Sequence, residues 1–302
     1  MPDVPSIVVI VNPDSRRFRR GNHESILRKL FEQKGIPVDI RRSQNLWHAR
    51  EMAGEAARNC NLVVAAGGDG TVRYLACELR GAEAVLGVLP MGSGNDLCTA
   101  LEIPYQLDRA VDILRDGRCR KMDFGMIKGY DGFVNTLGIG FDGLVGYEAG
   151  RIRSLRGMLK YTWVTLKHIF SYRSSIMTIT LDGKVIRDCM LMVTIANGPM
   201  EGGGIRVAPS ADPFDGFLDV VMIRDLNMIR RIILFLRILI GLPPGPPVME
   251  SRKVRSISVQ SESPVYAHAD GELLDKELTS LEVHVEPQSV QVMTGPYLKS
   301  IK

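Results

Sequence analysis

Short apolar runs alternate with amphipathic stretches along the first 125 residues of the chain. The apolar runs cover residues 6–12, 36–42, 62–68 and 84–90, and stretches with helical spacing lie between them at residues 24–35, 46–59 and 71–81. Strands that are apolar on both faces and separated by helices are typical of a parallel sheet covered on both sides. This half is therefore predicted to be an α/β domain.

The pattern of hydrophobic and polar residues changes after about residue 125. Strand-like segments follow at residues 133–143, 176–198, 217–225, 254–272 and 280–295, with hairpin signals at Asp182-Gly183 and Asp270-Gly271. Two helical insertions are expected at about residues 150–171 and 226–242, and the Pro-rich residues 242–247 favour a rigid connector. This half is predicted to be a mostly antiparallel β domain.

The length of 302 residues fits two domains. We expect an α/β domain over residues 1–125 and a β-rich domain over residues 126–290. The last segment, residues 291–302, is expected to return to the first domain.

Composition narrows the class of protein. With 45% hydrophobic and 24% charged residues, the chain is typical of a globular protein. Five widely spaced cysteines without a CxxC pair, and histidines without ligand spacing, indicate neither a disulfide framework nor a zinc site. The start of the chain lacks the basic region of a signal peptide, and Arg230, Arg231 and Arg237 interrupt its most apolar stretch. We expect a cytoplasmic protein.

A glycine-rich turn at residues 67–71, GGDGT, follows one of the buried strands and opens a helix. Backbone N–H groups of such a turn, together with the helix N-terminus, form a site for phosphate oxygens. Glycine allows the close approach and the positive φ angles that this requires. An anionic Asp69 among phosphates implies a cation between them, which points to Mg²⁺. A tight structural turn capped by Asp69 is the alternative.

A second turn of the same kind, GSGND at residues 92–96, follows the next strand. Parallel strands bring both turns to the carboxyl edge of one sheet, where α/β folds hold ligands. A third carboxylate, Asp123, follows at the predicted domain junction. Two glycine-rich turns with carboxylates, together with Asp123, favour a ligand site over a purely structural turn.

These motifs resemble those of the diacylglycerol kinase catalytic domain family, the soluble bacterial lipid kinases akin to sphingosine and ceramide kinases. The resemblance also rests on residues 11–15, 135–143, 197–220 and 269–272, and it covers nearly the whole chain. It implies a first domain like those of NAD kinase and phosphofructokinase. One position differs from the family pattern, because Arg16 stands where the family has a glycine after Ser15. The family's geometry for that loop is therefore not assumed for this chain.

The resemblance implies ATP as the phosphoryl donor and Mg²⁺ as its metal. The positions that match nucleotide contacts are Asn12, Pro13, Asp14, Ser15, Arg16, Ser43, Gly67, Gly68, Asp69, Gly70, Thr71, Val72, Arg73 and Ser93. Three positions match the carboxylates that organise the catalytic Mg²⁺: Asp69, Asp96 and Asp123.

Two further sites are implied in the second domain. Asp212, Asp215 and the carbonyl of Phe217 match a structural Mg²⁺ site, with a surface turn as the alternative. Asp270 and Glu272 match positions that deprotonate the substrate hydroxyl, and Glu272 is the preferred base. A simple hairpin turn is the alternative for Asp270-Gly271.

The expected reaction is ATP- and Mg²⁺-dependent phosphorylation of a membrane-lipid hydroxyl, with diacylglycerol giving phosphatidic acid. Phosphoryl transfer needs an in-line phosphate, neutralised charge and a carboxylate near the attacking hydroxyl. Phosphate loops in one domain and a base in the other lead us to expect a cleft between the domains. The alternatives are a kinase acting on NAD or another small molecule, and a non-catalytic lipid- or nucleotide-binding regulator.

A soluble lipid kinase needs a surface for its membrane-bound substrate. Residues 151–173 and 228–242 combine basic and apolar side chains near helical spacing. Such helices suit peripheral binding to anionic lipid at the inner face of the membrane, whereas core-facing helices with solvated basic faces are the alternative. No nucleic-acid partner is expected, and a homodimer is left open.

Overall fold

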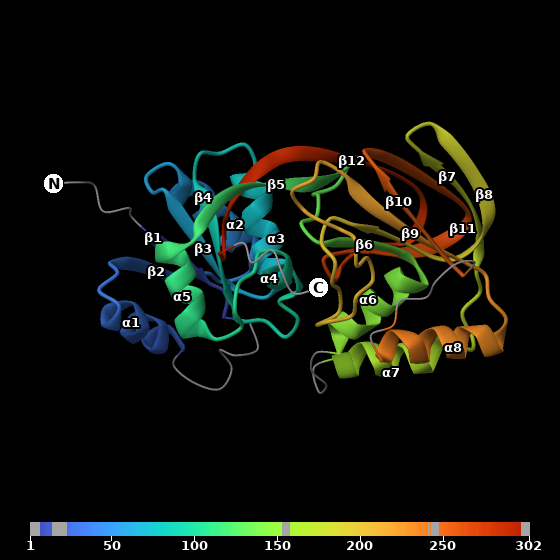
Figure 1. Cartoon of the computed structure of the whole chain (residues 1–302), viewed down its shortest axis with the longest axis horizontal. Helices are drawn as coiled ribbons and strands as arrows, with labels where there is room; N and C mark the ends of the chain where they lie inside the picture. Colours follow the sequence, from blue (N-terminus) through green and yellow to red (C-terminus); the bar gives the residue numbers. More distant parts are fainter. Residues whose placement is uncertain (1–6, 14–22, 153–157, 241, 243–247, 297–302) are drawn as a thin grey trace. The chain divides into compact units, whose positions relative to one another are not determined.

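The computed structural model describes residues 7–13, 23–152, 158–240, 242 and 248–296 (Figure 1). The chain divides into two compact units. Unit 1 comprises Met1–Met122 with Gln288–Lys302, and unit 2 comprises Asp123–Pro287. The polypeptide passes from one unit to the other within two strands, β5 (Arg118–Ile127) and β12 (Glu272–Thr294).

Unit 1 contains strands whose residues are apolar on both faces. Its strands are β1 (Ile7–Val11), β2 (Val38–Arg42), β3 (Leu62–Gly67) and β4 (Val85–Pro90), and its helices are α1 (His23–Gln33), α2 (Leu46–Ala57), α3 (Asp69–Leu79), α4 (Asp96–Ala100) and α5 (Leu107–Asp116). The strands pair in the order β2–β1–β3–β4, and each pair is parallel. Every residue of β1 and β3 is buried, as expected for strands covered on two sides.

The end of the chain contributes to unit 1. Val292 in β12 pairs in parallel with Leu86 in β4. The N–H of Gly81 donates to the carbonyl of Ser289 at 2.7 Å, and the N–H of Gly295 donates to the carbonyl of Leu101 at 2.9 Å. Residues on both sides of β4 thus bond to the carboxyl-terminal segment.

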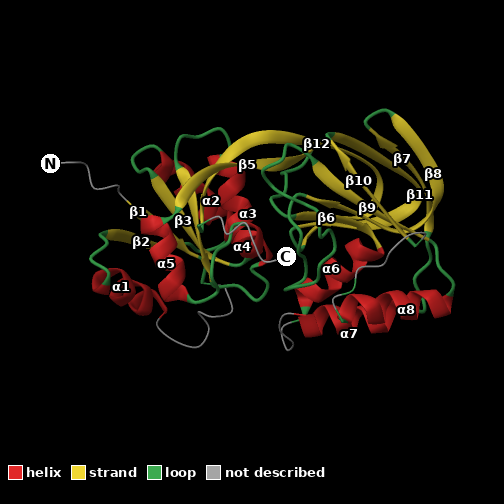
Figure 2. Ribbon diagram, viewed as in Figure 1, coloured by secondary structure: helices red, strands yellow, loops and turns green. Residues whose placement is uncertain are grey.

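Unit 2 is built mainly from antiparallel strands (Figure 2). They are β6 (Thr136–Gly140), β7 (Ser175–Leu181), β8 (Lys184–Ala196), β9 (Leu218–Arg224), β10 (Met249–Val254) and β11 (Ser256–Ala269), together with parts of β5 and β12. The order is β10–β9–β8–β6–β11–β12, with β7 pairing to both β8 and β11.

Both predicted hairpins of unit 2 are confirmed. Asp182-Gly183 joins β7 to β8 with φ angles of 44° and 85°, and Asp270-Gly271 joins β11 to β12 with φ angles of 50° and 80°. Two successive positive φ values are the feature of type I′ turns, in which Asp-Gly is a favoured pair.

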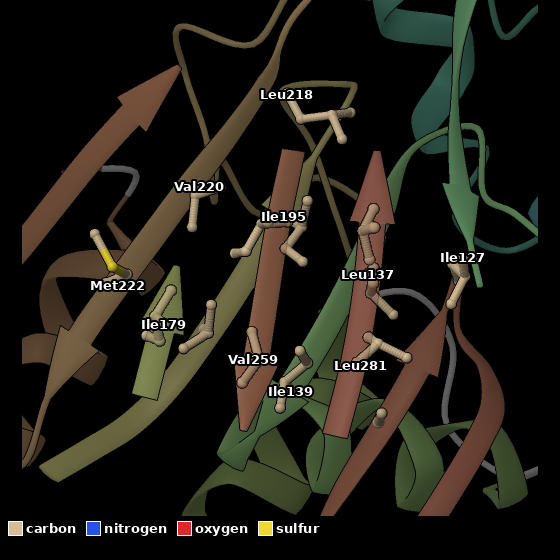
Figure 3. Packing of buried hydrophobic residues seen from close by; sticks show 14 of the residues in the cluster. Ile127, Leu137, Ile139, Ile179, Ile195, Leu218, Val220, Met222, Val259 and Leu281 are labelled. Carbon is tan, nitrogen blue, oxygen red and sulfur yellow. The ribbon is translucent and has the colours of Figure 1, made fainter. Parts of the chain in front are cut away.

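The main core of unit 2 is formed by aliphatic side chains from neighbouring strands (Figure 3). Leu137 and Ile139 of β6 lie among Ile195 of β8, Val259 of β11 and Leu281 of β12, and all five are almost fully buried. Successive side chains of a strand point to opposite faces of the sheet, and those on the inward face form this core.

Helix α6 (Phe141–Arg151) was missed in part, because residues 133–143 are predicted as a strand. Its Gly143 and Gly146 weaken the helical signal. Both positions require glycine because α6 packs closely on β11. A Cβ on Gly143 would lie 2.0 Å from the Tyr266 carbonyl oxygen, and one on Gly146 would lie 2.2 Å from Cδ2 of His268.

Helices α7 (Met158–His168) and α8 (Met228–Leu239) lie with α6 on one side of the strands of unit 2 (Figure 2). Buried side chains of the three helices, including Val145, Val164 and Leu234, pack in one apolar cluster. In the described part of the chain, no helix is both long and apolar enough to cross a membrane.

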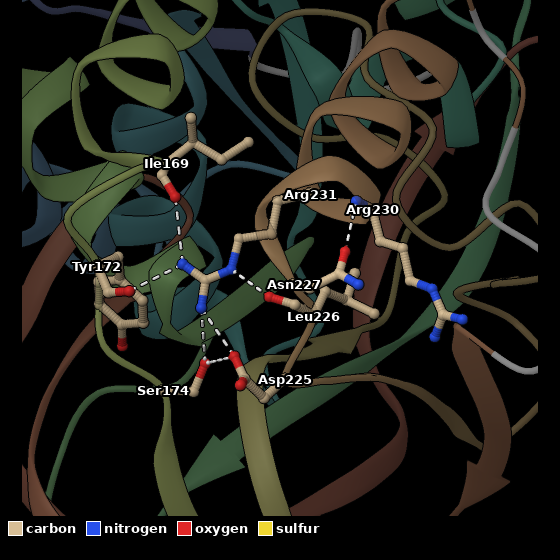
Figure 4. Close-up of polar contacts among 8 residues, drawn as sticks. All are labelled: Ile169, Tyr172, Ser174, Asp225, Leu226, Asn227, Arg230 and Arg231. Carbon is tan, nitrogen blue, oxygen red and sulfur yellow. Dashed lines mark hydrogen bonds and ion pairs between the residues drawn. The ribbon is translucent and has the colours of Figure 1, made fainter.

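Arg231 does not belong to the solvated basic face that is the alternative expectation for residues 228–242 (Figure 4). Its side chain is buried and donates to the carbonyls of Leu226, Ile169 and Tyr172 at 2.9, 3.1 and 2.8 Å. It also pairs with Asp225 at 2.7 Å. Arg231 therefore joins the start of α8 to the segment that follows α7.

Candidate active site

The two glycine-rich turns of unit 1 lie against each other. Gly67 at the end of β3 is in register with Pro90 at the end of β4, and the N–H of Met91 donates to the Gly67 carbonyl at 3.0 Å. A Cβ on Gly92 would lie only 2.4 Å from Cα of Gly68. The turns therefore meet backbone to backbone, and a side chain at Gly92 would force them apart.

Asp69 links these turns through its carboxylate. Oδ2 accepts the N–H of Asn95 at 2.9 Å, and Oδ1 accepts the N–H of Asp96 at 2.8 Å. Burial raises the pKa of Asp69, while the two N–H groups act in the opposite direction. The Asp69 carboxylate is thus oriented by backbone N–H groups of the second turn.

Asn95 has a role that the motif alone did not reveal. Its backbone is left-handed, with φ of 58°. Its Oδ1 accepts the N–H of Gly92 at 2.8 Å, and its Nδ2 donates to the Gly92 carbonyl at 3.2 Å. Asparagine tolerates this conformation better than most residues. Asn95 therefore holds the second turn in the shape that directs two N–H groups to Asp69.

The end of β1 reaches the start of α3. Asn12 donates from Nδ2 to Oγ1 of Thr71 at 3.0 Å, and its N–H donates to the Ala66 carbonyl at 3.3 Å. A Cβ on Gly67 would lie 2.4 Å from the same Thr71 Oγ1. Gly68 occupies the N-cap of α3 and brings no capping side chain. Asn12, Thr71 and both turns therefore meet at one edge of the sheet.

Several positions matched to nucleotide contacts are buried. Val72 and Arg73 are inward-facing residues of α3, and Ser43 is 2% exposed. The hydroxyl of Ser43 donates to the carbonyl of Val11 at 3.1 Å, so it already has a backbone partner. For these three residues, nucleotide contact stays a prediction.

The remaining matched positions of unit 1 differ in accessibility. Ser93 is exposed, and Pro13 and Gly70 are partly buried. Three matched positions, Asp14, Ser15 and Arg16, lie outside the described residues.

Asp270 of unit 2 is enclosed by backbone donors. Its Oδ1 accepts the N–H groups of Asn135 and Thr136, and its Oδ2 accepts that of Val134, each at 2.9 Å. The residue is 8% exposed. Glu272, the first residue of β12, is exposed instead. The two candidate bases therefore lie in contrasting surroundings.

Asp123 lies in unit 2, whereas Asp69 and the buried Asp96 lie in unit 1. The side chain of Asp123 is fully buried, and Oδ2 accepts the N–H of Gly216 at 2.6 Å. Its own N–H donates to the carbonyl of Pro213 at 2.8 Å. Asp123 thus supports the loop that contains the implied structural metal site, and its part in binding the catalytic Mg²⁺ stays a prediction.

The implied structural metal site does not fit a divalent cation in its present arrangement. Asp212 accepts the N–H of Phe214 at 3.1 Å, and Oδ1 of Asp215 accepts the N–H of Phe217 at 3.0 Å. The other oxygen of Asp215 pairs with the ammonium group of Lys253. A cationic side chain therefore already occupies the acceptor that a metal would need.

A different acidic cluster was missed. Asp142, Glu201 and His268 are buried, and their potential ligand atoms lie within 4.8 Å of one another. Nε2 of His268 is 2.9 Å from Oε1 of Glu201, while Nδ1 accepts the N–H of Gly271 at 3.2 Å. Burial raises the pKa of Glu201, and the nearby Asp142 carboxylate raises it further.

This cluster favours protons over a metal. Nδ1 of His268 accepts an N–H, so a neutral ring would carry its proton on Nε2, where a metal would need a lone pair. Asp142, Glu201 and His268 are far apart in the sequence, so no local spacing of residues predicts the cluster. The sequence carries one sign of the cluster, a glycine beside it. A Cβ on Gly138 would lie 2.5 Å from both the Asp142 carboxylate and Nε2 of His268.

Unit 2 also contains an apolar cavity of about 100 Å³ between its helices and the sheet. Phe141, Tyr161, Leu234 and Phe235 contribute to its wall, and the carboxylate residues Asp142 and Glu201 also line it. A cavity of this size can receive a short apolar segment beside a few polar groups.

The outer faces of α7 and α8 carry large apolar side chains. Trp163 of α7 is 58% exposed, and Ile229 and Leu236 of α8 are 70% and 53% exposed. Leu159 and Leu166 of α7 are exposed in the same way. We call these residues the apolar ridge of unit 2.

Comparisons with known proteins agree with this architecture. Residues 6–127 match the family described as diacylglycerol kinase catalytic domain, and residues 135–294 match the family described as YegS C-terminal NAD kinase beta sandwich-like domain. The diacylglycerol kinase of Mycobacterium tuberculosis (strain CDC 1551 / Oshkosh) is 27% identical over 301 residues, covering 96% of each chain.

A diacylglycerol kinase of Bacillus subtilis (strain 168) is 28% identical over 291 residues, covering 92% of this chain and 94% of the relative. Among solved structures, the crystal structure of a diacylglycerol kinase from Bacillus anthracis str. Sterne superposes with a TM-score of 0.75 at 21% identity. The match covers 98% of this chain and 99% of that one, and it shows the fold.

Proposed function

The chain belongs to the diacylglycerol kinase catalytic domain family and carries the YegS-type β-rich domain after it, and on this premise we propose that it transfers the γ-phosphoryl group of ATP to a hydroxyl of diacylglycerol. The family makes it a kinase. The observation that carries the proposal is the Asp69 carboxylate, which two N–H groups orient where the two glycine-rich turns meet.

Nucleotide binding in unit 1 is supported by the chemistry of this edge. The N-terminus of α3 favours anionic oxygens, and Gly68 leaves it without a capping side chain. Asp69 and Asp96 would hold Mg²⁺ through its water ligands, and the ion when bound would neutralise charge on the phosphates. In this proposal the residues of the turns bind and orient the phosphates, and they supply no covalent step.

Proton removal is proposed for Glu272. The lipid hydroxyl oxygen bonds to the γ-phosphorus as the bond from that phosphorus to the bridging oxygen breaks, and the hydroxyl proton passes to the Glu272 carboxylate. Exposure of Glu272 supports this role. Asp270 is less suited to it because three backbone N–H groups already occupy its carboxylate.

Lipid as the substrate class is supported by unit 2. The apolar cavity beside Asp142 and Glu201 suits part of an acyl chain. The apolar ridge suits peripheral contact with a bilayer, because such exposed apolar surface is unusual on a protein that meets only water. We therefore propose that the enzyme works at the surface of an anionic membrane.

Substrate choice tests the proposal directly. The purified full-length chain is incubated with labelled ATP, Mg²⁺ and mixed micelles of diacylglycerol, monoacylglycerol, sphingosine or phosphatidylglycerol, and with NAD in parallel. We expect label in diacylglycerol. Label in NAD and none in any lipid would reject the proposed substrate in favour of the small-molecule alternative.

Asp69→Asn tests the site itself. We expect at least a ~10²-fold loss of kcat, as is typical when a preorganised charge is removed from a transition state. The matched control is Asp116→Asn, which removes an exposed carboxylate of the same unit that pairs with Arg115 at 2.6 Å. Equal activity of both variants would remove Asp69 from the mechanism.

A further inference from the structure

The loop over residues 210–219 of unit 2 contains the implied structural metal site, yet a lysine from another strand reaches into it. We infer that the ammonium group of Lys253 is the built-in cation of this loop and replaces a divalent metal there. The inference concerns cation binding in unit 2 and does not depend on the substrate proposed above.

Three acceptors surround the Lys253 ammonium group. It donates to the Ser210 carbonyl at 3.2 Å, pairs with Oδ2 of Asp215, and lies 3.3 Å from Oδ2 of Asp219. An ammonium group has three N–H donors and no acceptor. Two of these acceptors form hydrogen bonds with the ammonium group, and the buried Oδ2 of Asp219 is paired with it by charge alone.

The sheet itself sets this arrangement. Strands β9 and β10 are antiparallel, and their register places Lys253 directly opposite Asp219. Asp219 is 2% exposed, and its other oxygen accepts the hydroxyl of Ser210 at 2.6 Å. A buried carboxylate needs a charged or hydrogen-bonding partner. Lys253 meets that need for Asp219 and Asp215 together.

A divalent cation would compete with Lys253 for the same oxygen of Asp215. Mg²⁺ requires near-octahedral oxygen ligands at roughly 2.0–2.1 Å. It would have to displace the ammonium group or bind beside it, and like charges at close range repel. The loop of this chain is thus expected to hold its shape without metal, unlike the site implied by the family resemblance.

Thermal unfolding of the full-length chain without nucleotide or lipid tests the inference. We expect the wild-type chain to have the same Tm in EDTA and in millimolar Mg²⁺. Lys253→Ala should lower Tm in EDTA by a few degrees and should regain part of the loss in Mg²⁺, because it exposes the two carboxylates to the ion. The double variant Lys253→Ala with Asp215→Asn should lose that response.

Lys128→Ala is the matched control, because Lys128 pairs with Glu282 at 2.7 Å on the surface of the same unit. It should acquire no response to Mg²⁺. A folded Lys253→Ala variant without any response would overturn the inference. Electron paramagnetic resonance of added Mn²⁺ gives a second test on the wild-type chain: a bound ion that Asp215→Asn removes would overturn it even if the alanine variant fails to fold.

Discussion

Asp69 and Asp270 perform the same local task in different units, since each carboxylate accepts backbone N–H groups from a neighbouring segment. Their surroundings differ. Asp270 is buried and accepts N–H groups at the start of β6, whereas Asp69 is only partly buried and accepts N–H groups of the second glycine-rich turn. Three backbone donors make Asp270 a clamp on the entry to β6, which is a structural role for a residue matched to the base.

Comparing Asp270→Asn with Glu272→Gln separates the clamp from the base. An asparagine nitrogen cannot accept an N–H, so we expect Asp270→Asn to reduce the free energy of unfolding by roughly 1–3 kcal/mol. Exposed Glu272→Gln should change it by no more than about 0.5 kcal/mol. The same Glu272→Gln variant should lower kcat by roughly 10²–10⁴-fold.

Urea unfolding and a lipid kinase assay on both variants provide the measurements. A stable but inactive Asp270→Asn variant together with an active Glu272→Gln variant would transfer the role of base to Asp270.

Individual residues were predictable where the chemistry is local. The glycines of GGDGT correctly predicted close packing, since a Cβ on Gly67 would lie 2.4 Å from Oγ1 of Thr71. The expected positive φ angles were wrong, because none of Gly67, Gly68 and Gly70 adopts a positive φ. Phosphate binding by this turn stays a prediction. Lys253 was not predictable, because its partners are reached only through the register of β9 and β10. His268 likewise meets Glu201 only after the sheet has formed.

At the scale of elements, one buried polar side chain helps to hold α8 in place, in addition to its apolar packing. Arg231 bonds to three carbonyls around the segment between α7 and β7 and the start of α8, and to Asp225 (Figure 4). Buried carbonyls left without a donor are costly. The attachment of α8, which lines the apolar cavity, therefore depends on this guanidinium group.

Arg231→Met should reduce the free energy of unfolding by about 2–4 kcal/mol, because it leaves buried carbonyls and a carboxylate without their donor. Arg230→Met is the control: Arg230 is the exposed neighbour, and its side chain points away from this network (Figure 4). It should change stability by about 0.5 kcal/mol or less. Urea unfolding measures both, and equal losses would contradict the assignment.

The ion pair between Arg231 and Asp225 makes the stability of the protein depend on pH. Burial raises the pKa of Asp225, but the hydroxyl of Ser174 and the guanidinium of Arg231 outweigh it and hold the pKa below its usual range. A lowered pKa in the folded state adds stability above the ordinary value of about 3.9 and loses it as the pH falls. The stability difference between wild type and Arg231→Met should therefore narrow in acid.

Elements differed in how well the sequence predicts them. The Asp-Gly hairpins were predictable because the turn conformation depends on those two residues alone. Helix α6 was predicted incorrectly, because Gly143 and Gly146 lower helix propensity and are present for contact with β11. The interior position of Arg231 was also missed, since the three carbonyls that it contacts carry no sequence signal.

At the scale of the whole molecule, the exposed apolar surface is concentrated on two helices of unit 2. Its apolar ridge includes Trp163, and the chain's other tryptophan, Trp47, lies in unit 1 with nearly equal exposure, 59% against 58%. Each tryptophan therefore reports on a different unit.

Intrinsic fluorescence of single-tryptophan variants tests membrane contact. With anionic phosphatidylglycerol vesicles, we expect a blue shift in Trp47→Phe, which retains Trp163, and none in Trp163→Phe, which retains Trp47. Added salt should weaken the shift where basic side chains assist binding. A shift in Trp163→Phe alone would place the membrane-binding surface in unit 1.

The return of β12 to unit 1 has a consequence for biosynthesis. Val292, Ser289 and Gly295 complete the sheet and loops around β4, so unit 1 lacks these bonds until residues 289–295 have been synthesised. A nascent chain can assemble the two glycine-rich turns early, but the unit that contains them is complete only after β12 has been synthesised. A stop codon just before Ser289 would accordingly damage unit 1, although most of that unit is translated first.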